Sequence, residues 1–143
     1  MSEMSHPSGI AVETITEMLR LATAAAERSY SPYSKFRVGA AILLTDGSVH
    51  TGCNVENASY RLTTCAEQTA VAKAVSERGP GIKLRAVALA NLNGAASMPC
   101  GACRQTLWEF GDEETWVFFP GADGPQELKL SELLPYGFRL KQK

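Results

Sequence analysis

Two short motifs place cysteine beside other reactive residues at a spacing that suits metal chemistry. The first is Thr64-Cys65-Ala66-Glu67, and the second is Pro99-Cys100-Gly101-Ala102-Cys103. Cys100 and Cys103 are three positions apart, so on a helix their sulfur atoms share one face. Cys65 is the natural third ligand. Three protein ligands leave one tetrahedral position for water, which is the pattern of a catalytic zinc site.

Both motifs stand where a loop gives way to an expected helix. The first turn of a helix stabilises negative charge and lowers the pKa of a thiol. Two helix N-termini directed at one point could therefore keep three thiolates beside one ion. We expect one Zn²⁺ per chain, bound by Cys65, Cys100 and Cys103.

A single Cys-x-x-Cys pair also has other interpretations, as a redox pair or as half of a structural zinc knuckle. The chain has no second pair of this kind, and its two histidines, His6 and His50, lie outside the motifs. A closed four-ligand site is therefore disfavoured, and neither histidine is expected to bind metal. Cys53, the fourth cysteine, falls in the middle of an expected strand, where the role of a small buried apolar residue fits it best.

Glu67 lies two residues from Cys65, in the first turn of the same expected helix. On its own, Thr64-x-x-Glu67 matches a capping box, in which the glutamate accepts a hydrogen bond from the cap residue's N–H. Beside a cysteine that opens the helix, we favour a catalytic role. One carboxylate could take a proton from a metal-activated water and then deliver it to the substrate.

The rest of the chain supplies the elements that position these motifs. Helical spacing predicts a first helix over residues 9–29, and a hairpin with an Asp46-Gly47 turn joins strands over 37–44 and 49–55. Helices are expected at 64–78, 101–110 and, weakly, 131–134, and strands at 84–90, 115–119 and 126–130. This order predicts an α/β fold, a three-layer α/β/α sandwich with a mixed sheet of about five strands.

Length and composition narrow the class of protein. The 143 residues fit one domain, 1–143, with 1–9 as a flexible tail. The net charge is −1, from 14 basic and 15 acidic residues, so the basic surplus of a nucleic-acid-binding protein is missing. No apolar run approaches the roughly 20 residues of a membrane span, and no signal peptide is visible. We expect a cytoplasmic protein that acts on a neutral small molecule, with neither nucleic acid nor membrane as partner.

Together the two motifs resemble those of the small, three-cysteine cytidine deaminases, and the likeness runs over about residues 31–138. Cys65-Ala66-Glu67 followed by Pro99-Cys100-Gly101-Ala102-Cys103 matches the general signature of zinc deaminases, which also includes editors of RNA and DNA. The resemblance implies hydrolytic deamination of cytidine and 2'-deoxycytidine to uridine and 2'-deoxyuridine, with release of ammonia, as in pyrimidine salvage. It makes Glu67 the proton carrier and directs the N–H of Ala66 at the ring carbonyl.

Within the zinc deaminases, one further segment points to those that act on nucleosides. It is Asn54-Val55-Glu56-Asn57-Ala58-Ser59-Tyr60. By that likeness Asn54 and Glu56 bind the sugar hydroxyls, and Ala58 and Tyr60 belong to the same site. An amide and a carboxylate can together donate to and accept from a diol. Without the resemblance, a simple turn after the strand would explain Asn54 and Glu56 as well. Phe36 is expected to pack against the pyrimidine, a role compatible with core packing.

The C-terminal Leu133-Leu134-Pro135-Tyr136-Gly137-Phe138 also resembles the family. There a phenylalanine crosses from a neighbouring subunit to cover the base, and proteins of this size are homotetramers. The resemblance therefore implies a homotetramer with shared active sites, in which Phe138 completes the site of its neighbour. The alternative is that Phe138 packs on its own domain or is disordered.

One residue departs from the family pattern. An arginine usually follows the catalytic glutamate and offsets the thiolate charge, whereas this chain has Gln68. Zinc with three thiolates carries a formal charge of −1, which opposes acidification of the bound water. Gln68 can donate hydrogen bonds to sulfur but adds no positive charge. Either the helix dipoles suffice or another cation, such as Arg104, assists.

Two other functions compete with this interpretation. A deaminase of a cytosine-containing antibiotic such as blasticidin S would share both motifs, but it would not need Asn54 and Glu56 to hold a ribose. A structural-zinc module that binds nucleic acid is the alternative from a different class. The neutral charge and the open three-ligand site count against it.

Overall fold

The computed structural model describes residues 6–142, which are built around a mixed five-stranded sheet. The strands are β1 (Val38–Leu44), β2 (Val49–Cys53), β3 (Leu84–Asn91), β4 (Trp116–Gly121) and β5 (Gly124–Lys129). They lie in the order β2-β1-β3-β4-β5, with β3 parallel to β4 and the other pairs antiparallel. The helices are α1 (Val12–Ala26), α2 (Ala66–Arg78), α3 (Gly101–Phe110) and α4 (Leu130–Leu133), with a 3-10 turn, η1, at Tyr60–Leu62.

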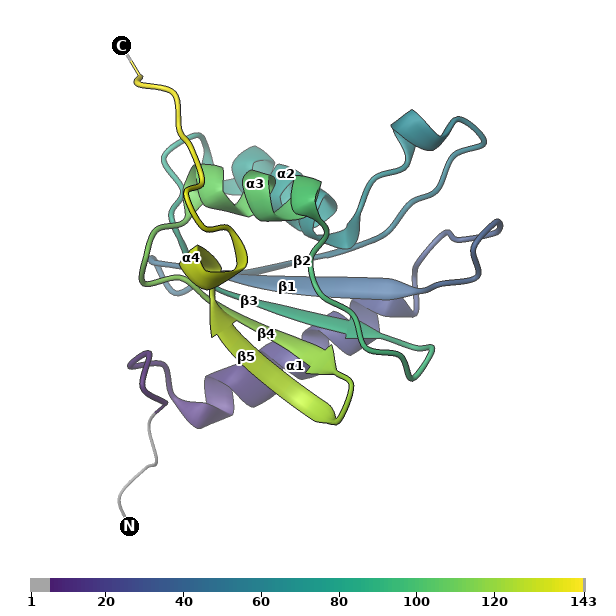
Figure 1. Cartoon of the computed structure of the whole chain (residues 1–143), viewed down its shortest axis with the longest axis horizontal. Coiled ribbons are helices and arrows are strands. Elements are labelled where there is room, and N and C mark those ends of the chain that lie inside the picture. Colours follow the sequence, from purple (N-terminus) through teal and green to yellow (C-terminus); the bar gives the residue numbers. More distant parts are fainter. Residues whose placement is uncertain (1–5, 143) are drawn as a thin grey trace.

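The helices cover both faces of the sheet (Figure 1). Alternating side chains of β1 divide between the two faces, as a strand requires. Ile42 and Leu44 pack with α2 and α3, whereas Ala41 and Leu43 pack with α1. The predicted three-layer α/β/α sandwich is therefore confirmed. None of the helices within residues 6–142 is both long and apolar enough to span a bilayer.

Gly52 of β2 fixes the height of α2 above the sheet. A β-carbon at this position would lie 2.4 Å from the backbone nitrogen of Ala70 and 2.7 Å from the carbonyl oxygen of Ala66. Any side chain here would push the helix away, so the glycine lets the first turns of α2 rest directly on the strand. The N-terminus of α2, where the first motif lies, is thereby held against the sheet.

The helix and strand boundaries differ modestly from the predicted ones. The first helix is shorter than the predicted 9–29, because the N–H groups of Glu27, Arg28 and Ser29 form tighter turns with carbonyls three residues back. The second begins at Ala66 rather than at residue 64, and the short last helix begins at Leu130. The final hairpin extends through Gly121 and Gly124. The 3-10 turn η1 was not predicted.

The structure also places His6 and Cys53, two residues outside the motifs. His6 to Gly9 form a turn, and the His6 ring packs edge-on against Trp116, with 4.7 Å between ring centroids, and pairs with Glu127. Residues 6–9 of the expected tail thus form a turn that contacts β4 and β5, while residues 1–5 lie outside the described part of the chain. Cys53 is the last residue of β2 and is only half-buried, so it is not the mid-strand core residue that was expected.

Candidate metal centre

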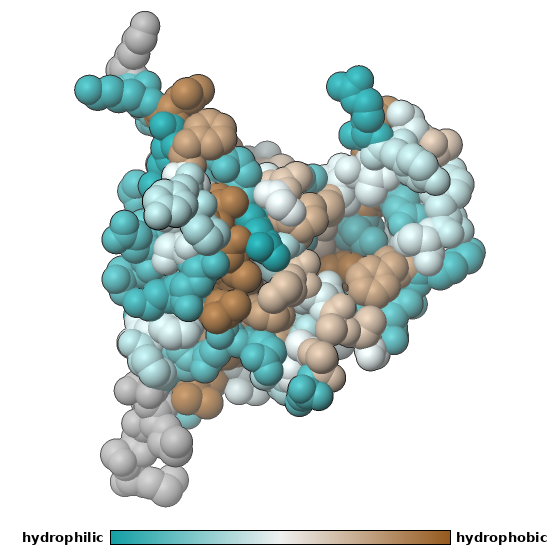
Figure 2. All heavy atoms as spheres, viewed as in Figure 1, coloured by the Kyte–Doolittle hydropathy of each residue, from teal (hydrophilic) through white to brown (hydrophobic). Residues whose placement is uncertain are grey.

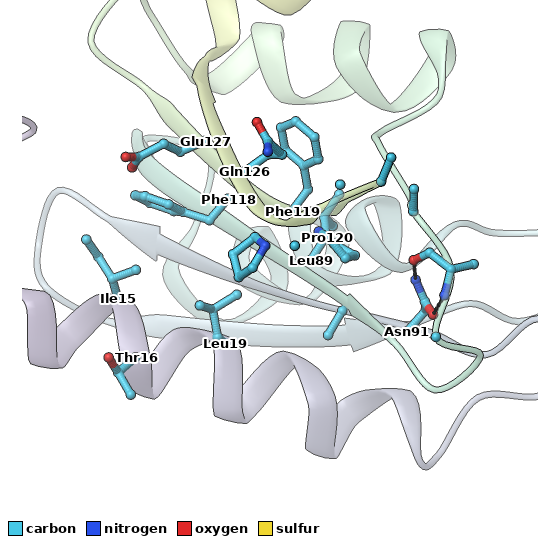
Figure 3. Close-up of a pocket in the computed structure, with 18 of the residues that line it drawn as sticks. Ile15, Thr16, Leu19, Leu89, Asn91, Phe118, Phe119, Pro120, Gln126 and Glu127 are labelled. Atoms are coloured by element: carbon cyan, nitrogen blue, oxygen red, sulfur yellow. Dashed lines mark hydrogen bonds between the residues drawn. The ribbon is translucent and has the colours of Figure 1, made fainter.

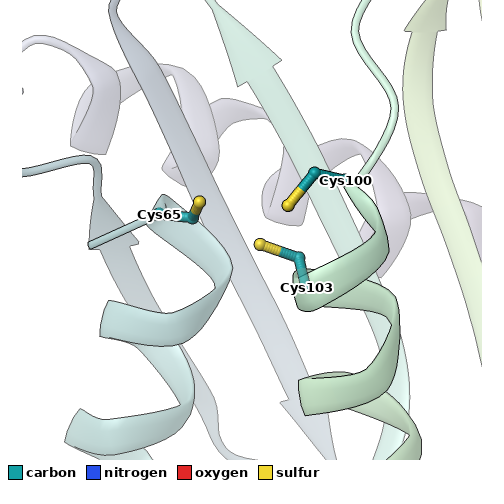
Figure 4. Close-up of side chains that lie close together, drawn as sticks. All are labelled: Cys65, Cys100 and Cys103. Atoms are coloured by element: carbon teal, nitrogen blue, oxygen red, sulfur yellow. The ribbon is translucent and has the colours of Figure 1, made fainter. Parts of the chain in front are cut away.

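The three motif cysteines converge between the N-termini of α2 and α3 (Figure 4). Cys65 is the N-cap residue of α2, Cys100 is the N-cap residue of α3, and Cys103 lies one turn further along α3. Their sulfur atoms all lie within 4.8 Å of one another. The predicted meeting of two helix N-termini is therefore present, and it results from the packing of α2 beside α3 on one face of the sheet.

This arrangement fits a zinc ion. Tetrahedral thiolates at about 2.3 Å from zinc are separated by roughly 3.8 Å, so the cluster needs only small side-chain adjustments. The thiol of Cys103 donates a hydrogen bond that lowers the pKa of Cys65 to about 7, and the same bond raises the pKa of Cys103. The Cys65 thiol therefore ionises more readily than an ordinary cysteine, and thiolates are the form that binds metal.

Glu67 lies in the first turn of α2 with only 5% of its surface exposed. Burial raises the pKa of its carboxyl group, and smaller contributions from its own N–H and the Cys103 thiol oppose that rise. The predicted alternative, a capping box of Thr64 with Glu67, is wrong: the N-cap residue is Cys65, and the residue that accepts from its N–H is Gln68, at 3.2 Å. Glu67 is therefore free of a capping role and is buried next to the cysteine cluster.

Arg104 makes no hydrogen bond to the sulfur atoms of Cys65, Cys100 and Cys103. Its guanidinium donates to the carbonyls of Pro99 and Leu133 at 2.8 and 2.7 Å, and it lies 3.8 Å from the sulfur of Met98. Within residues 6–142 no hydrogen bond joins Arg104 or the Gln68 side chain to a cysteine sulfur. The positive charge nearest in sequence to the cluster is thus committed to backbone carbonyls.

Asn54 and Glu56 lie on the segment that leads from β2 to α2. Val55 and Thr64 exchange backbone hydrogen bonds of 2.8 Å, which places this segment beside the residue before Cys65. The amide of Asn54 donates to the Phe36 carbonyl at 2.7 Å and accepts from the Val38 N–H at 3.0 Å. It therefore ties residues 36–38 to the end of β2 and keeps one N–H for another partner.

The carboxylate of Glu56 faces the loop of residues 31–36. It accepts hydrogen bonds from the backbone N–H groups of Tyr33 and Ser34 at 3.0 and 3.1 Å, and from the Ser34 hydroxyl. The Ser34 hydroxyl is the main reason that the pKa of Glu56 is lowered. The role of Ser34 was not predicted, and the sequence offered no signal for it beyond its place in the family-like stretch.

A cavity of about 340 Å³ adjoins this carboxylate, lined by Tyr33, Ser34, Glu56, Asn57, Tyr60 and Thr63. Phe36, the last residue of the same loop, is half-buried, and Ala66 is buried at the start of α2. Ala58 and Tyr60 lie on the projecting segment 54–65, and Tyr60 is 87% exposed. This segment stands away from the rest of the molecule, and the surface beside it is hollowed (Figure 2).

Phe138 lies in the C-terminal segment that follows α4, and 64% of its surface is exposed. Gln105 donates to its carbonyl at 3.1 Å, and the next residue, Arg139, stacks over the Trp108 ring with 4.0 Å between guanidinium and ring centre. The segment is therefore anchored to α3 by its backbone and by Arg139. The Phe138 side chain is left largely uncovered.

A larger groove, of about 690 Å³, lies away from the cysteines between α1 and the β4–β5 hairpin (Figure 3). Ile15 and Leu19 line it from α1, and Phe118 lines it from β4. It contains none of the three cysteines and neither Glu67 nor Glu56. The reactive side chains of the two motifs therefore lie outside this groove.

Comparison with known proteins assigns the site to a family. The model for the cytidine and deoxycytidylate deaminase zinc-binding region matches residues 12–119, which include both motifs. A cytidine deaminase of Halalkalibacterium halodurans is 46% identical over 122 residues, covering 85% of this chain and 91% of that protein. A cytidine deaminase of Mycobacterium tuberculosis is 49% identical over 119 residues, covering 83% and 85% of the two chains.

The fold agrees with this assignment. The crystal structure of a cytidine deaminase from Burkholderia pseudomallei superposes with a TM-score of 0.78 at 40% identity, covering 86% of this chain and 98% of that one. The predicted resemblance is thus confirmed both by sequence and by the arrangement of helices and strands. With three clustered cysteines, a buried glutamate beside them, and relatives 46–49% identical over most of its length, this chain belongs to the cytidine deaminase family.

Proposed function

We propose that the chain is a zinc-dependent hydrolase that converts cytidine and 2'-deoxycytidine to uridine and 2'-deoxyuridine with release of ammonia. The observation that carries this proposal is the cluster of three thiols at two helix N-termini with the buried carboxyl group of Glu67 beside it. The relatives that share the fold and most of the chain length are cytidine deaminases.

In this proposal Cys65, Cys100 and Cys103 bind one Zn²⁺ per chain. When bound, zinc acts as a Lewis acid that lowers the pKa of a coordinated water. Glu67 would remove a proton from this water and deliver it to N3 of the cytosine ring as the water oxygen bonds to C4. It would then take the proton of the new C4 hydroxyl group and deliver it to the 4-amino group, so that the C4–N bond breaks, ammonia leaves and the C4 carbonyl of the product forms. Its raised pKa suits these steps, because a general acid–base group works best when its pKa approaches the working pH. The N–H of Ala66, in the first turn of α2, donates to the ring carbonyl.

We assign the sugar to the side of the site formed by Asn54 and Glu56, with Ala58 and Tyr60 next to it and Phe36 against the pyrimidine. The free N–H of Asn54 and the remaining lone pairs of Glu56 are suited to the sugar hydroxyls. The cavity beside Glu56 is lined by no lysine or arginine, and the Glu56 carboxylate is itself anionic. A phosphate would be repelled there, so a free nucleoside is favoured over a nucleotide.

We further propose a homotetramer in which Phe138 of one subunit closes the site of another. Two features support this assembly. The C-terminal segment exposes Tyr136, Phe138 and Leu140, and the segment between β2 and α2 exposes Tyr60 and Leu62. Large apolar side chains left in solvent on projecting segments are typical of protein–protein contacts.

The chemistry of the cysteines also bears on the cellular compartment. A three-thiolate site needs reduced cysteines, so we place the enzyme in the cytoplasm, where it would act in pyrimidine salvage. Residues 1–143 form one catalytic domain in this proposal. A deaminase of blasticidin S and a zinc module that binds nucleic acid are less favoured, since the relatives are cytidine deaminases and the net charge is −1.

The decisive experiment is to incubate the zinc-loaded protein with cytidine and to measure uridine and ammonia in equal amounts. Deoxycytidine, deoxycytidylate, blasticidin S and single-stranded DNA serve as parallel substrates. We expect turnover of both nucleosides, little of the nucleotide and none of the other two. Turnover of blasticidin S without turnover of cytidine would overturn the assignment, as would a zinc-loaded protein inactive on every nucleoside.

A further inference from the structure

The loop that delivers Cys100 to the cluster has little regular structure of its own. Residues 92–99 connect β3 to α3 without forming a helix or a strand. A backbone hydrogen bond of 2.8 Å from Ser97 to the carbonyl of Pro120 holds the middle of this loop. Its end, Met98 and Pro99, needs a separate anchor, because Pro99 has no N–H to donate.

Arg104 supplies that anchor from within α3. Its Nε donates to the Pro99 carbonyl at 2.8 Å, and its Nη2 lies 3.8 Å from the Met98 sulfur. Arg104 directly follows Cys103 in the chain, and Pro99 directly precedes Cys100. The guanidinium thus links the two ends of the segment that carries Cys100 and Cys103.

The other side of the guanidinium reaches a rigid part of the core. Nη1 donates to the carbonyl of Leu133 at 2.7 Å, at the end of α4. Leu130 and Leu133 of this helix are buried, and the Leu130 N–H donates to the Thr115 carbonyl at 2.8 Å. The Arg104 side chain therefore connects the loop before Cys100 to the core beside β4 and β5.

We propose that Arg104 is a positioning residue of the metal centre, which acts by holding Pro99 and hence Cys100 in place and not by neutralising thiolate charge. A planar guanidinium fork holds its N–H groups at fixed positions about 2 Å apart, so it can serve two carbonyls in different directions without losing further freedom. A lysine keeps the charge but offers a single flexible ammonium group. The inference rests on the proposed three-cysteine zinc site. It adds that the zinc affinity of this site depends on the hydrogen bonds of the Arg104 guanidinium.

The experiment compares Arg104→Lys with Arg139→Lys. Arg139 is a matched control, because it also donates to two carbonyls, those of Trp108 and Gly111, but at the opposite end of α3. The zinc dissociation constant of each purified variant is measured by competition with a chromophoric chelator. The absorption spectrum of each protein saturated with Co²⁺ reports the geometry of the thiolate ligands. Thermal unfolding of the metal-free proteins monitors general loss of stability.

We expect Arg104→Lys to weaken zinc binding about 10- to 100-fold, the usual effect of losing a residue that orients a ligand, and to alter the Co²⁺ spectrum. Arg139→Lys should leave both unchanged even if it unfolds at a lower temperature. Wild-type affinity and spectrum in Arg104→Lys would overturn the proposal in favour of a charge effect. An equal loss in Arg139→Lys would overturn it in favour of general destabilisation. A wild-type protein that binds no zinc would instead refute the proposed function itself.

Discussion

The side-chain oxygen of Gln68 accepts a hydrogen bond from the backbone N–H of Cys65 at 3.2 Å. The residue after Glu67 thus caps α2 and holds the backbone of a candidate zinc ligand. An arginine here could not accept this bond, since a guanidinium only donates. In this chain the Gln68 side chain therefore helps to fix the backbone of Cys65, and we propose that the charge of three thiolates is balanced mainly by the two helix N-termini.

The first prediction concerns metal content. Serine in place of Cys65, Cys100 or Cys103 should remove bound zinc and activity, because each sulfur belongs to the same cluster. Cys53→Ser is the control and should keep both, since Cys53 lies at the end of β2 outside the cluster. Zinc per chain is measured by atomic absorption. A full complement of zinc in Cys65→Ser would contradict the assignment.

The second prediction concerns catalysis by Glu67. Glu67→Gln keeps the size of the side chain but cannot carry protons. General acid–base catalysis contributes roughly 10²–10⁴ in rate, and this residue acts more than once, so kcat should fall by at least the upper figure while zinc is retained. Steady-state kinetics with cytidine test this. A loss smaller than about tenfold would show that another group moves the protons.

The same substitution has a predicted effect on stability. Burial raises the folded-state pKa of Glu67 above its ordinary value of 4.5, so the ionised carboxylate destabilises the fold at neutral pH. This penalty is complete above the raised pKa, declines as the pH falls through it, and is absent below the unfolded-state value. Metal-free Glu67→Gln should therefore melt higher than wild type at pH 7, and the difference should vanish near pH 4. Calorimetry across this range would reveal a constant difference if burial were not the cause.

The fourth prediction separates the two effects of an arginine at position 68. Gln68→Arg adds positive charge beside the thiolates, so the acid limb of the pH–rate profile should move to lower pH. It also removes the acceptor for the Cys65 N–H, which should cost about 1 kcal/mol of unfolding free energy. Gln68→Met, which removes the acceptor without adding charge, should show the stability loss alone. An unmoved acid limb in Gln68→Arg would mean that charge at this position does not govern the bound water.

The fifth prediction concerns Phe138 and assembly. Phe138→Ala should lose most activity at unchanged zinc content, because the exposed ring would no longer cover a neighbour's substrate. Mixing inactive Glu67→Gln subunits with inactive Phe138→Ala subunits should restore part of the activity, since some sites then combine an intact Glu67 with an intact Phe138. Light scattering establishes subunit exchange. Exchange without recovery, or a fully active Phe138→Ala, would show that each chain closes its own site.

The sequence predicted the architecture well because its patterns are local. The hairpin of β1 and β2 follows from Asp46-Gly47, and α3 begins and ends at the predicted residues because Gly101 follows a loop and Gly111 stops the helix. The convergence of the three cysteines was predicted from the position of both motifs at helix N-termini, and the packing of α2 beside α3 brings these ends together. The ends of α1 and η1 were missed, because they depend on weak local turns without a periodic pattern.

What the sequence could not reveal were the partners of polar side chains. Nothing in the pattern Thr64-x-x-Glu67 distinguishes it from Cys65-x-x-Gln68 as the capping pair, since a shift of one residue depends on where the helix begins. The carbonyl partners of Arg104 come from α4 and from the loop before α3, far apart in the sequence. Likewise, the packing of His6 against Trp116 needs the sheet to bring the two together.

Because the three sulfur atoms lie on two separate helices, a bound metal ion would also crosslink the chain. An ion shared by Cys65 and Cys100 closes a long loop of chain, as a disulfide would, and constrains the unfolded state by an amount on the order of 3 kcal/mol. The same ion that activates water would therefore staple α2 to α3. A cell short of zinc would lose this protein to unfolding and proteolysis as well as to inactivity, so that metal supply would govern how long each molecule survives.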